Sequence, residues 1–141
     1  MEKKEITNKA DIILLVDRFY EKVQADDRIG YIFNDIAKVD WNKHLPTMYN
    51  FWESLLLDGS NYRGNTMAPH FRINQLIPLE AAHFDRWITL FESTVNELFK
   101  GENAALAITR ARSIKDIMAY KMNQINHPDN NKKIPLINPG S

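Results

Sequence analysis

The chain has 141 residues, a length that fits one domain able to bury about two-thirds of its unfolded surface. Its 18 basic and 18 acidic side chains cancel, so no net field attracts nucleic acid or an anionic membrane, and we expect neither as a partner. The absence of cysteine excludes disulfides and cysteine-built zinc sites. The charged N-terminus lacks the apolar run of a signal peptide, and the longest unbroken apolar stretch, residues 12–16, is far too short to span a membrane. We therefore expect a cytoplasmic protein.

Apolar side chains recur at helical spacing in the first half of the chain. Thr7 and Asn8 both suit a helix N-cap, and the helix that follows is expected to run to about residue 24. Its apolar stripe contains Ile12, Val16, Phe19, Tyr20 and Val23. A short helical turn is expected to end at residues 32–34. The next helix is expected to begin at residues 42–44 and to end near residue 57, because this start keeps Pro46 in the first turn, where proline is tolerated.

The second half is also helical. Residues 58–66 are rich in glycine and asparagine and predict a loop. A short helix is expected over about residues 67–73, then a long helix that Pro78 opens and Gly101 ends, then a last helix over about residues 102–126. The inner stripe predicted for the last helix is Ala107, Ala111, Ile114, Met118, Met122 and Ile125. With no strand pattern, the class is all-α: a single domain over residues 1–126 and a disordered or loosely docked tail over residues 127–141.

Two of the four histidines can face apolar surface. On a helix, His44 shares one face with Met48, Phe51 and Trp52, and its place near the positive end of the helix dipole favours a neutral ring at pH 7. Taken alone, a histidine beside an apolar stripe is more often a partly buried core residue than a ligand. Two such histidines on separate helices, His44 and His70, could enclose a flat, apolar ligand that contains a metal.

Two aromatic side chains add polar groups to this apolar surface. The hydroxyl of Tyr20 and the indole N–H of Trp87 need partners if they are buried, and donors that point into an apolar cavity orient small polar ligands.

His83 follows Glu80 with the Glu-x-x-His spacing of di-iron bundles, but those sites need a second copy that the chain lacks. We therefore expect His83 to be exposed.

Several short motifs, taken in their order, carry a resemblance to a known family. They are Phe19-Tyr20, Ile32-Phe33-Asn34, His44-x-x-x-Met48-x-x-Phe51-Trp52, Tyr62-x-Gly64 before His70, His83-Phe84-x-Arg86-Trp87-x-x-Leu90-Phe91, and Phe99-x-Gly101-Glu102 before a helix rich in alanine and arginine. Together they resemble the group III truncated haemoglobins of the globin superfamily over roughly residues 6–125. The glycine-glycine motifs of the other truncated groups are absent from the sequence.

The resemblance implies a truncated globin, a two-over-two helical sandwich, that binds haem b (iron protoporphyrin IX). It implies that His70 ligates the iron on the proximal side, that Tyr20 and Trp87 are distal hydrogen-bond donors, and that His44 is a distal residue able to swing toward solvent. Lys43 and Arg72 are candidate partners of the haem carboxylates. The residues expected to line the haem pocket are Phe19, Phe33, Met48, Phe51, Trp52, Met67, Ile73 and Phe91.

A histidine as the sole strong protein ligand leaves one iron position open for dioxygen, nitric oxide or a similar small molecule. Distal hydrogen bonds of about 1–3 kcal/mol each would slow ligand escape, since each 1.4 kcal/mol is about tenfold. Strong retention suits oxygen, nitric oxide or peroxide chemistry better than oxygen transport. A nitric-oxide dioxygenase or peroxidase activity would need a separate reductase, and nothing demands more than a monomer. The alternative is a haem-free interaction or signalling domain with a globin-like fold.

Overall fold

The computed structural model describes residues 3–57 and 67–128, and these residues form helices joined by short connections. The elements are α1 (Lys9–Ala25), a turn of π-helix η1 (Ile32–Ile36), α2 (Trp41–Leu56), α3 (Met67–Leu76), α4 (Ala81–Leu98) and α5 (Glu102–Asn126). The described residues contain no strand, only a lone bridge between Lys4 and Phe99. The expected loop at 58–66 and residues 129–141 of the expected tail lie outside the described residues. The all-α prediction is confirmed.

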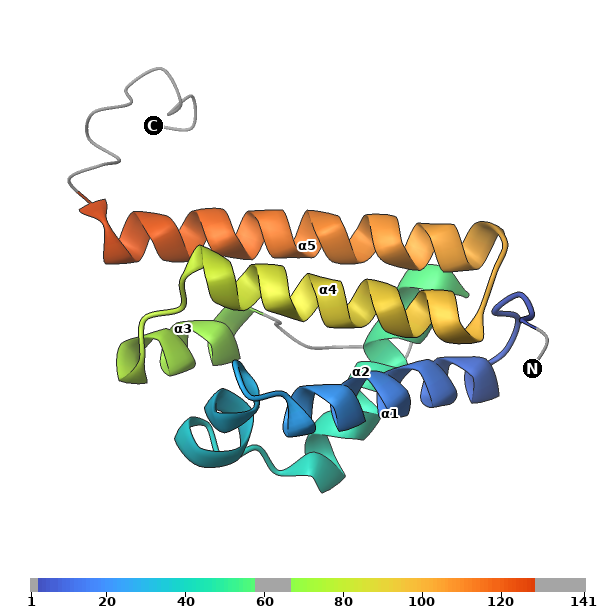
Figure 1. The fold of residues 1–141 in the computed structure, drawn as a ribbon, viewed down its shortest axis with the longest axis horizontal. Coiled ribbons are helices and arrows are strands. Elements are labelled where there is room, and N and C mark those ends of the chain that lie inside the picture. Colours follow the sequence, from blue (N-terminus) through green and yellow to red (C-terminus); the bar gives the residue numbers. More distant parts are fainter. Residues whose placement is uncertain (1–2, 58–66, 129–141) are drawn as a thin grey trace, which may run out of the picture.

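Four long helices form two layers. In Figure 1, α4 runs antiparallel along α5, and α1 lies on the other side of α4. Helix α2 crosses behind α1 and α4, and α3 lies beside the N-terminal end of α4. Contacts between α1 and α2, between α4 and α5, and between the two pairs close the core. This is the two-over-two arrangement that was predicted.

The first helix follows its prediction closely. The side chain of Asn8 accepts a hydrogen bond from the Asp11 amide at 3.0 Å and so satisfies one of the free donors at the helix start. The predicted stripe is buried throughout, and no member is more than 5% exposed. A continuous apolar face of this kind gains roughly 1.5–3 kcal/mol for each large side chain that leaves water.

The starts of α2 and α4 differ from their predictions. Asp40 caps α2 by accepting from the Asn42 amide at 3.1 Å, so Pro46 is the sixth helical residue and lies beyond the first turn. The backbone amide of Glu80 donates to Nδ1 of His83 at 3.0 Å, and α4 begins at Ala81, after Pro78. The expectation of an exposed His83 is wrong, because the side chain is half-buried and its ring caps the helix.

The corner before α5 depends on a glycine. Gly101 has φ 106°, a conformation that favours glycine, and a Cβ atom there would lie 2.4 Å from Oε2 of Glu5. The carboxylate of Glu5 accepts from the amides of Glu102 at 2.8 Å and Asn103 at 3.0 Å. Negative charge is favourable at this position because the dipole of α5 is positive at its first turn.

The inner face of α5 is as predicted, except at its end. Ala107, Ala111 and Met122 are fully buried, which allows close packing of the helices near the start of α5. Ile125 is 53% exposed, so its predicted place in the core is wrong. In the last turn Asn126, and not Ile125, faces the rest of the fold: its amide donates to the Asn74 side chain and to the Leu79 carbonyl.

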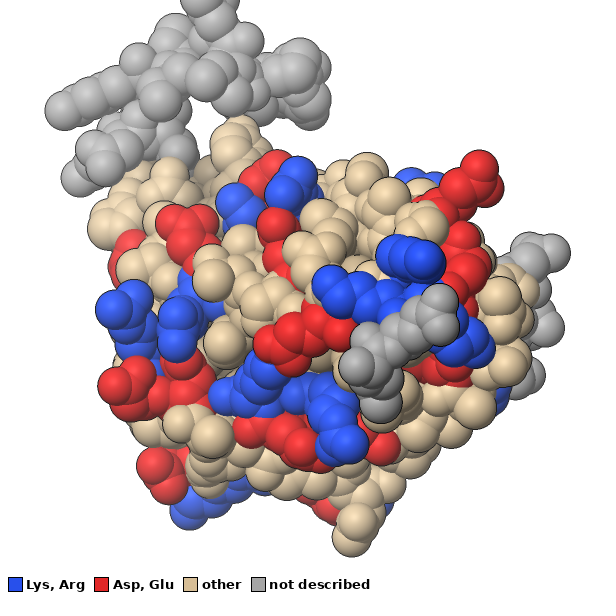
Figure 2. All heavy atoms as spheres, turned by 45° about the vertical axis from the view of Figure 1, so that its right-hand side comes forward, with Lys and Arg blue, Asp and Glu red and all other residues tan. Residues whose placement is uncertain are grey.

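No helix among the described residues is both long and apolar enough to cross a membrane. Figure 2 shows one face of the molecule, on which basic and acidic side chains are intermingled. Ion pairs among the described residues also join different helices, for example Lys22 with Glu97 and Arg112 with Glu92.

Candidate functional site

Tyr20 lies at the centre of an aromatic cluster built by three elements. Its ring centroid is 5.1 Å from that of His44 and 5.4 Å from that of Trp41, both on α2, and 6.2 Å from that of Phe33 on η1. Phe33 and Trp41 stack with centroids 6.1 Å apart. Tyr20 is 5% exposed, and burial raises the pKa of its hydroxyl. The hydroxyl therefore keeps its proton at neutral pH and is able to donate it in a hydrogen bond.

A second aromatic cluster begins at the neighbouring residue, Phe19. Its ring lies 5.5 Å from Trp87 and 5.2 Å from Phe91, both on α4, in edge-to-face contacts. Phe91 in turn stacks on Trp52 of α2 at 4.8 Å. Phe19 and Phe91 are fully buried, and Trp87 is half-buried. Phe19 also contacts Tyr20 at 4.8 Å, so the two clusters form one continuous aromatic wall.

His44 brings an unpartnered polar atom into this wall. It is the fourth residue of α2, where its backbone amide donates to the Asp40 carbonyl at 2.9 Å. Nε2 of its ring is buried and has no hydrogen-bond partner among the described residues. A buried polar group without a partner costs about 1–3 kcal/mol, so an atom of this kind marks a place for a ligand or water.

The two predicted histidines influence each other. The pKa of His44 is lowered, first by burial and then by the positive charge of His70 on α3. The neutral state of His44 that the sequence suggested is thus favoured, although burial, rather than the helix dipole, is the main cause. The structure brings Tyr20, His44 and His70 into one neighbourhood, although they come from three different helices.

The other predicted site residues differ in burial. Met48, Phe51 and Ile73 are half-buried and pack against the core. Lys43 and Arg72 are exposed, each beside one of the two histidines in the sequence, and neither forms an ion pair within residues 3–57 and 67–128. The side chain of Met67 lies outside the described part of the chain.

Trp41 is a site residue that the sequence reasoning missed. It contacts Tyr20, Phe33 and His44, the last at 5.6 Å. The signal was available, because Trp41 lies three residues before His44 and so shares its helix face. Because the predicted helix begins at residues 42–44, Trp41 falls outside its predicted apolar face.

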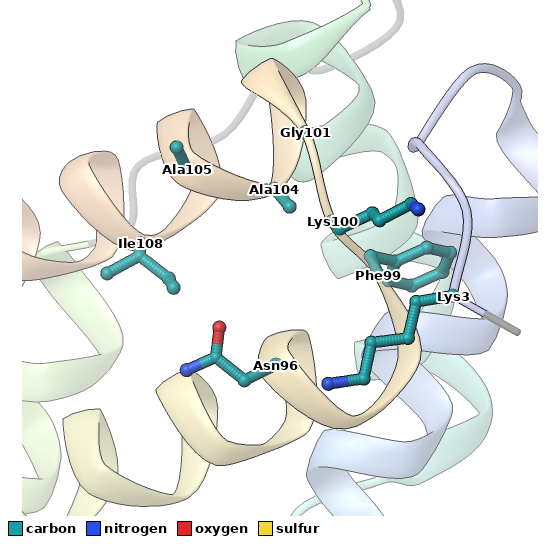
Figure 3. A pocket seen from close by; sticks show the side chains of 8 residues that line it. All are labelled: Lys3, Asn96, Phe99, Lys100, Gly101, Ala104, Ala105 and Ile108. Atoms are coloured by element: carbon teal, nitrogen blue, oxygen red, sulfur yellow. The ribbon is translucent and has the colours of Figure 1, made fainter.

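A hollow elsewhere among the described residues is separate from this site. A hollow of about 410 Å³ opens where α4 meets α5 (Figure 3), and none of the predicted pocket residues lines it. Within the described ranges, no group of three or more histidine, cysteine or acidic side chains could hold a metal ion.

Comparison with known proteins connects this site to a family. No family model matches the chain. It is 32% identical over 115 residues to the group 3 truncated hemoglobin ctb of Campylobacter jejuni, which covers 79% of this chain and 88% of that protein. The crystal structure of group III truncated hemoglobin from Campylobacter jejuni matches with a TM-score of 0.74 and 31% identity, covering 86% of this chain and 95% of that one. The chain belongs to the group III truncated haemoglobins.

Proposed function

We propose that the chain binds haem b with His70 as the proximal iron ligand and retains dioxygen, nitric oxide or a similar diatomic molecule. The observation that carries the proposal is the pair of Tyr20 and His44. Two polar side chains meet inside an aromatic wall, and Nε2 of His44 is buried there without a described partner. Membership of the truncated haemoglobins supports haem as the cofactor.

The residues present suit haem. A flat, apolar macrocycle packs well against aromatic side chains such as Phe33, Trp52 and Phe91, which come from η1, α2 and α4. His70 would supply the single strong protein ligand, and exposed Lys43 and Arg72 would meet the haem carboxylates at the edge of the pocket. When bound, haem supplies a redox-active iron with one open position for a ligand.

The distal side chains would decide how long a ligand stays. Among the described residues, neither the Tyr20 hydroxyl nor the Trp87 indole N–H forms a hydrogen bond within the chain, so both donors are available to a bound diatomic molecule. Neutral His44 has one ring N–H and one acceptor nitrogen, and it contacts Tyr20 edge-on. Hydrogen bonds gain strength in surroundings of low dielectric constant, which the aromatic wall provides.

Firm retention favours reactions of oxygen, nitric oxide or peroxide over oxygen transport. Turnover in a nitric-oxide dioxygenase or peroxidase cycle needs electrons from a separate reductase, and we propose a monomer that works with one. The alternative, a haem-free interaction or signalling domain, gives no account of the buried Nε2 atom of His44.

An absorption spectrum tests the proposal directly. The purified protein supplied with haem should show an intense Soret band at one haem per chain, with the shifts expected on reduction and on addition of carbon monoxide. His70→Ala should lose this band or change its position and height. His127→Ala is the matched control, because His127 pairs with Glu80 at the end of α5 and should leave the spectrum unchanged. A wild-type chain that takes up no stoichiometric haem would show that the proposal is wrong.

A further inference from the structure

An ion pair with a buried carboxylate joins the end of α1 to α4. Nε and Nη2 of Arg86 lie 2.7 and 2.6 Å from the same carboxylate oxygen, Oδ1 of Asp26. The other oxygen, Oδ2, accepts from the amides of Arg28 and Ile29, each at 3.0 Å. The Asp26 side chain is only 3% exposed, whereas that of Arg86 is 31% exposed. Every polar atom of this carboxylate therefore has a partner.

The charge state of the pair is fixed at neutral pH. Burial acts to raise the pKa of Asp26, but hydrogen bonds from Arg86 and from two backbone amides outweigh it, and the pKa is lowered. The pair is thus ionised throughout the physiological range. An ion pair with one buried partner often adds little to stability compared with apolar side chains, but its hydrogen bonds are directional, which suits a role in fixing geometry.

The pair links the two helices that carry the proposed distal donors. Asp26 is the C-cap residue of α1, the helix that carries Tyr20, and Arg86 directly precedes Trp87 on α4. Between the two donors lies Phe19, whose ring contacts Tyr20 at 4.8 Å and Trp87 at 5.5 Å. Apolar contacts of this kind tolerate small sliding of one helix along the other, whereas hydrogen bonds of 2.6–2.7 Å do not.

We propose that Arg86, held by Asp26, is a positioning residue that fixes the indole N–H of Trp87 relative to the Tyr20 hydroxyl at the ligand-binding site. This inference rests on the proposed function, because it concerns how the distal donors meet a diatomic ligand. Lys22 and Glu97 form another link between α1 and α4, at 2.7 Å, but Glu97 is 61% exposed and the pair is open to screening by solvent.

The test compares two arginines of the same helix layer in the haem-loaded protein. Arg86→Gln breaks the pair with Asp26, and Arg112→Gln breaks a bidentate pair with Glu92, in which both distances are 2.8 Å, on the side of α4 that meets α5. We expect Arg86→Gln to speed dioxygen dissociation about three- to tenfold, because the indole N–H of Trp87 is displaced but still present. The C–O stretch of the carbon monoxide complex should also shift. Arg112→Gln should change neither.

The decisive readout is the same substitution in a Trp87→Phe background. If Arg86 acts through Trp87, Arg86→Gln should add no further change once the indole N–H is gone. An equal effect in both backgrounds, or an Arg86→Gln rate that matches Arg112→Gln, would overturn the inference. Should Arg86→Gln fail to fold, Asp26→Asn takes its place in the same cycle, since an amide oxygen still accepts from the amides of Arg28 and Ile29. A wild-type protein without a Soret band would instead overturn the proposed function.

Discussion

Removal of the Tyr20 hydroxyl should separate ligand retention from stability. Tyr20→Phe keeps the ring, and with it the contacts to Phe19, Phe33, Trp41 and His44 at 4.8–6.2 Å. Only the O–H is lost. If this group donates to a polar diatomic ligand, the lost bond is charge-assisted and worth about 1.5–3 kcal/mol. Dioxygen should then dissociate about 10- to 150-fold faster.

The same substitution should not weaken the fold. The hydroxyl makes no hydrogen bond to the described residues, so its removal breaks no such bond. The free energy of unfolding of the haem-free chain should therefore stay the same. Most core substitutions lower stability, so an unchanged value is a demanding expectation.

Two measurements check the pair of expectations. Stopped-flow replacement of dioxygen by carbon monoxide gives the dissociation rate, and urea denaturation of the haem-free chain gives the free energy of unfolding. An unchanged dissociation rate would remove Tyr20 from the distal role. A faster rate together with a clear loss of stability would mean that the ring has moved, and the rate would then say nothing about the hydroxyl.

Two further predictions concern the folded chain without haem. In the folded chain the pKa of His44 lies below its ordinary value of 6.5, so between the two values the unfolded chain binds more protons, and the free energy of unfolding should fall as the pH drops below about 6.5. In urea denaturation from pH 7 to 5, His44→Phe should therefore lose less stability than the wild type. Equal losses would contradict burial of His44 as the cause. Gly101→Ala should lower the free energy of unfolding by about 2–3 kcal/mol, because φ 106° strains an alanine and the new Cβ displaces the capping carboxylate of Glu5. In the Glu5→Ala background the loss should be smaller. An undiminished loss in that background would exclude the clash with Glu5.

The sequence predicted the helices better than it predicted their starts. The bounds of α5 agree with the prediction, and those of α1 agree within a residue or two, because a long apolar stripe at helical spacing identifies a helix whatever lies around it. The predicted starts of α2 and α4 differ from the observed ones because they were inferred from the positions of Pro46 and Pro78. Asp40 and His83 cap these helices through side-chain hydrogen bonds, which depend on local geometry that a pattern of residue types does not contain.

The candidate site shows the same division. The apolar stripes identified Phe19, Tyr20, Trp52 and Phe91 as buried residues, and all four are buried. That Tyr20 lies 5.1 Å from His44 follows from the way α1 crosses α2, which helical periodicity does not predict. Periodicity alone assigns these residues to separate helices, and it is the resemblance to the truncated haemoglobins that groups them into one pocket. The roles of His70, Tyr20 and Trp87 stay predictions until spectra and rates test them.

The two sides of the site are held by different forces. The proposed distal side is an aromatic wall to which α1, η1, α2 and α4 all contribute, so several contacts hold each ring in place. The helix of His70, α3, is fixed at its far end by polar contacts. Asn74, one turn beyond His70 and 7% exposed, exchanges amide hydrogen bonds with Asn126 at 2.9 and 3.0 Å and accepts from the Leu79 amide at 2.7 Å. These bonds anchor α3 on the helix face that Asn74 shares with His70, because residues four apart lie on one face. On the proposed assignment, the Tyr20 hydroxyl governs ligand retention and His70 governs haem attachment, so Tyr20→Phe, which keeps the ring in the aromatic wall, should alter the first while sparing the second.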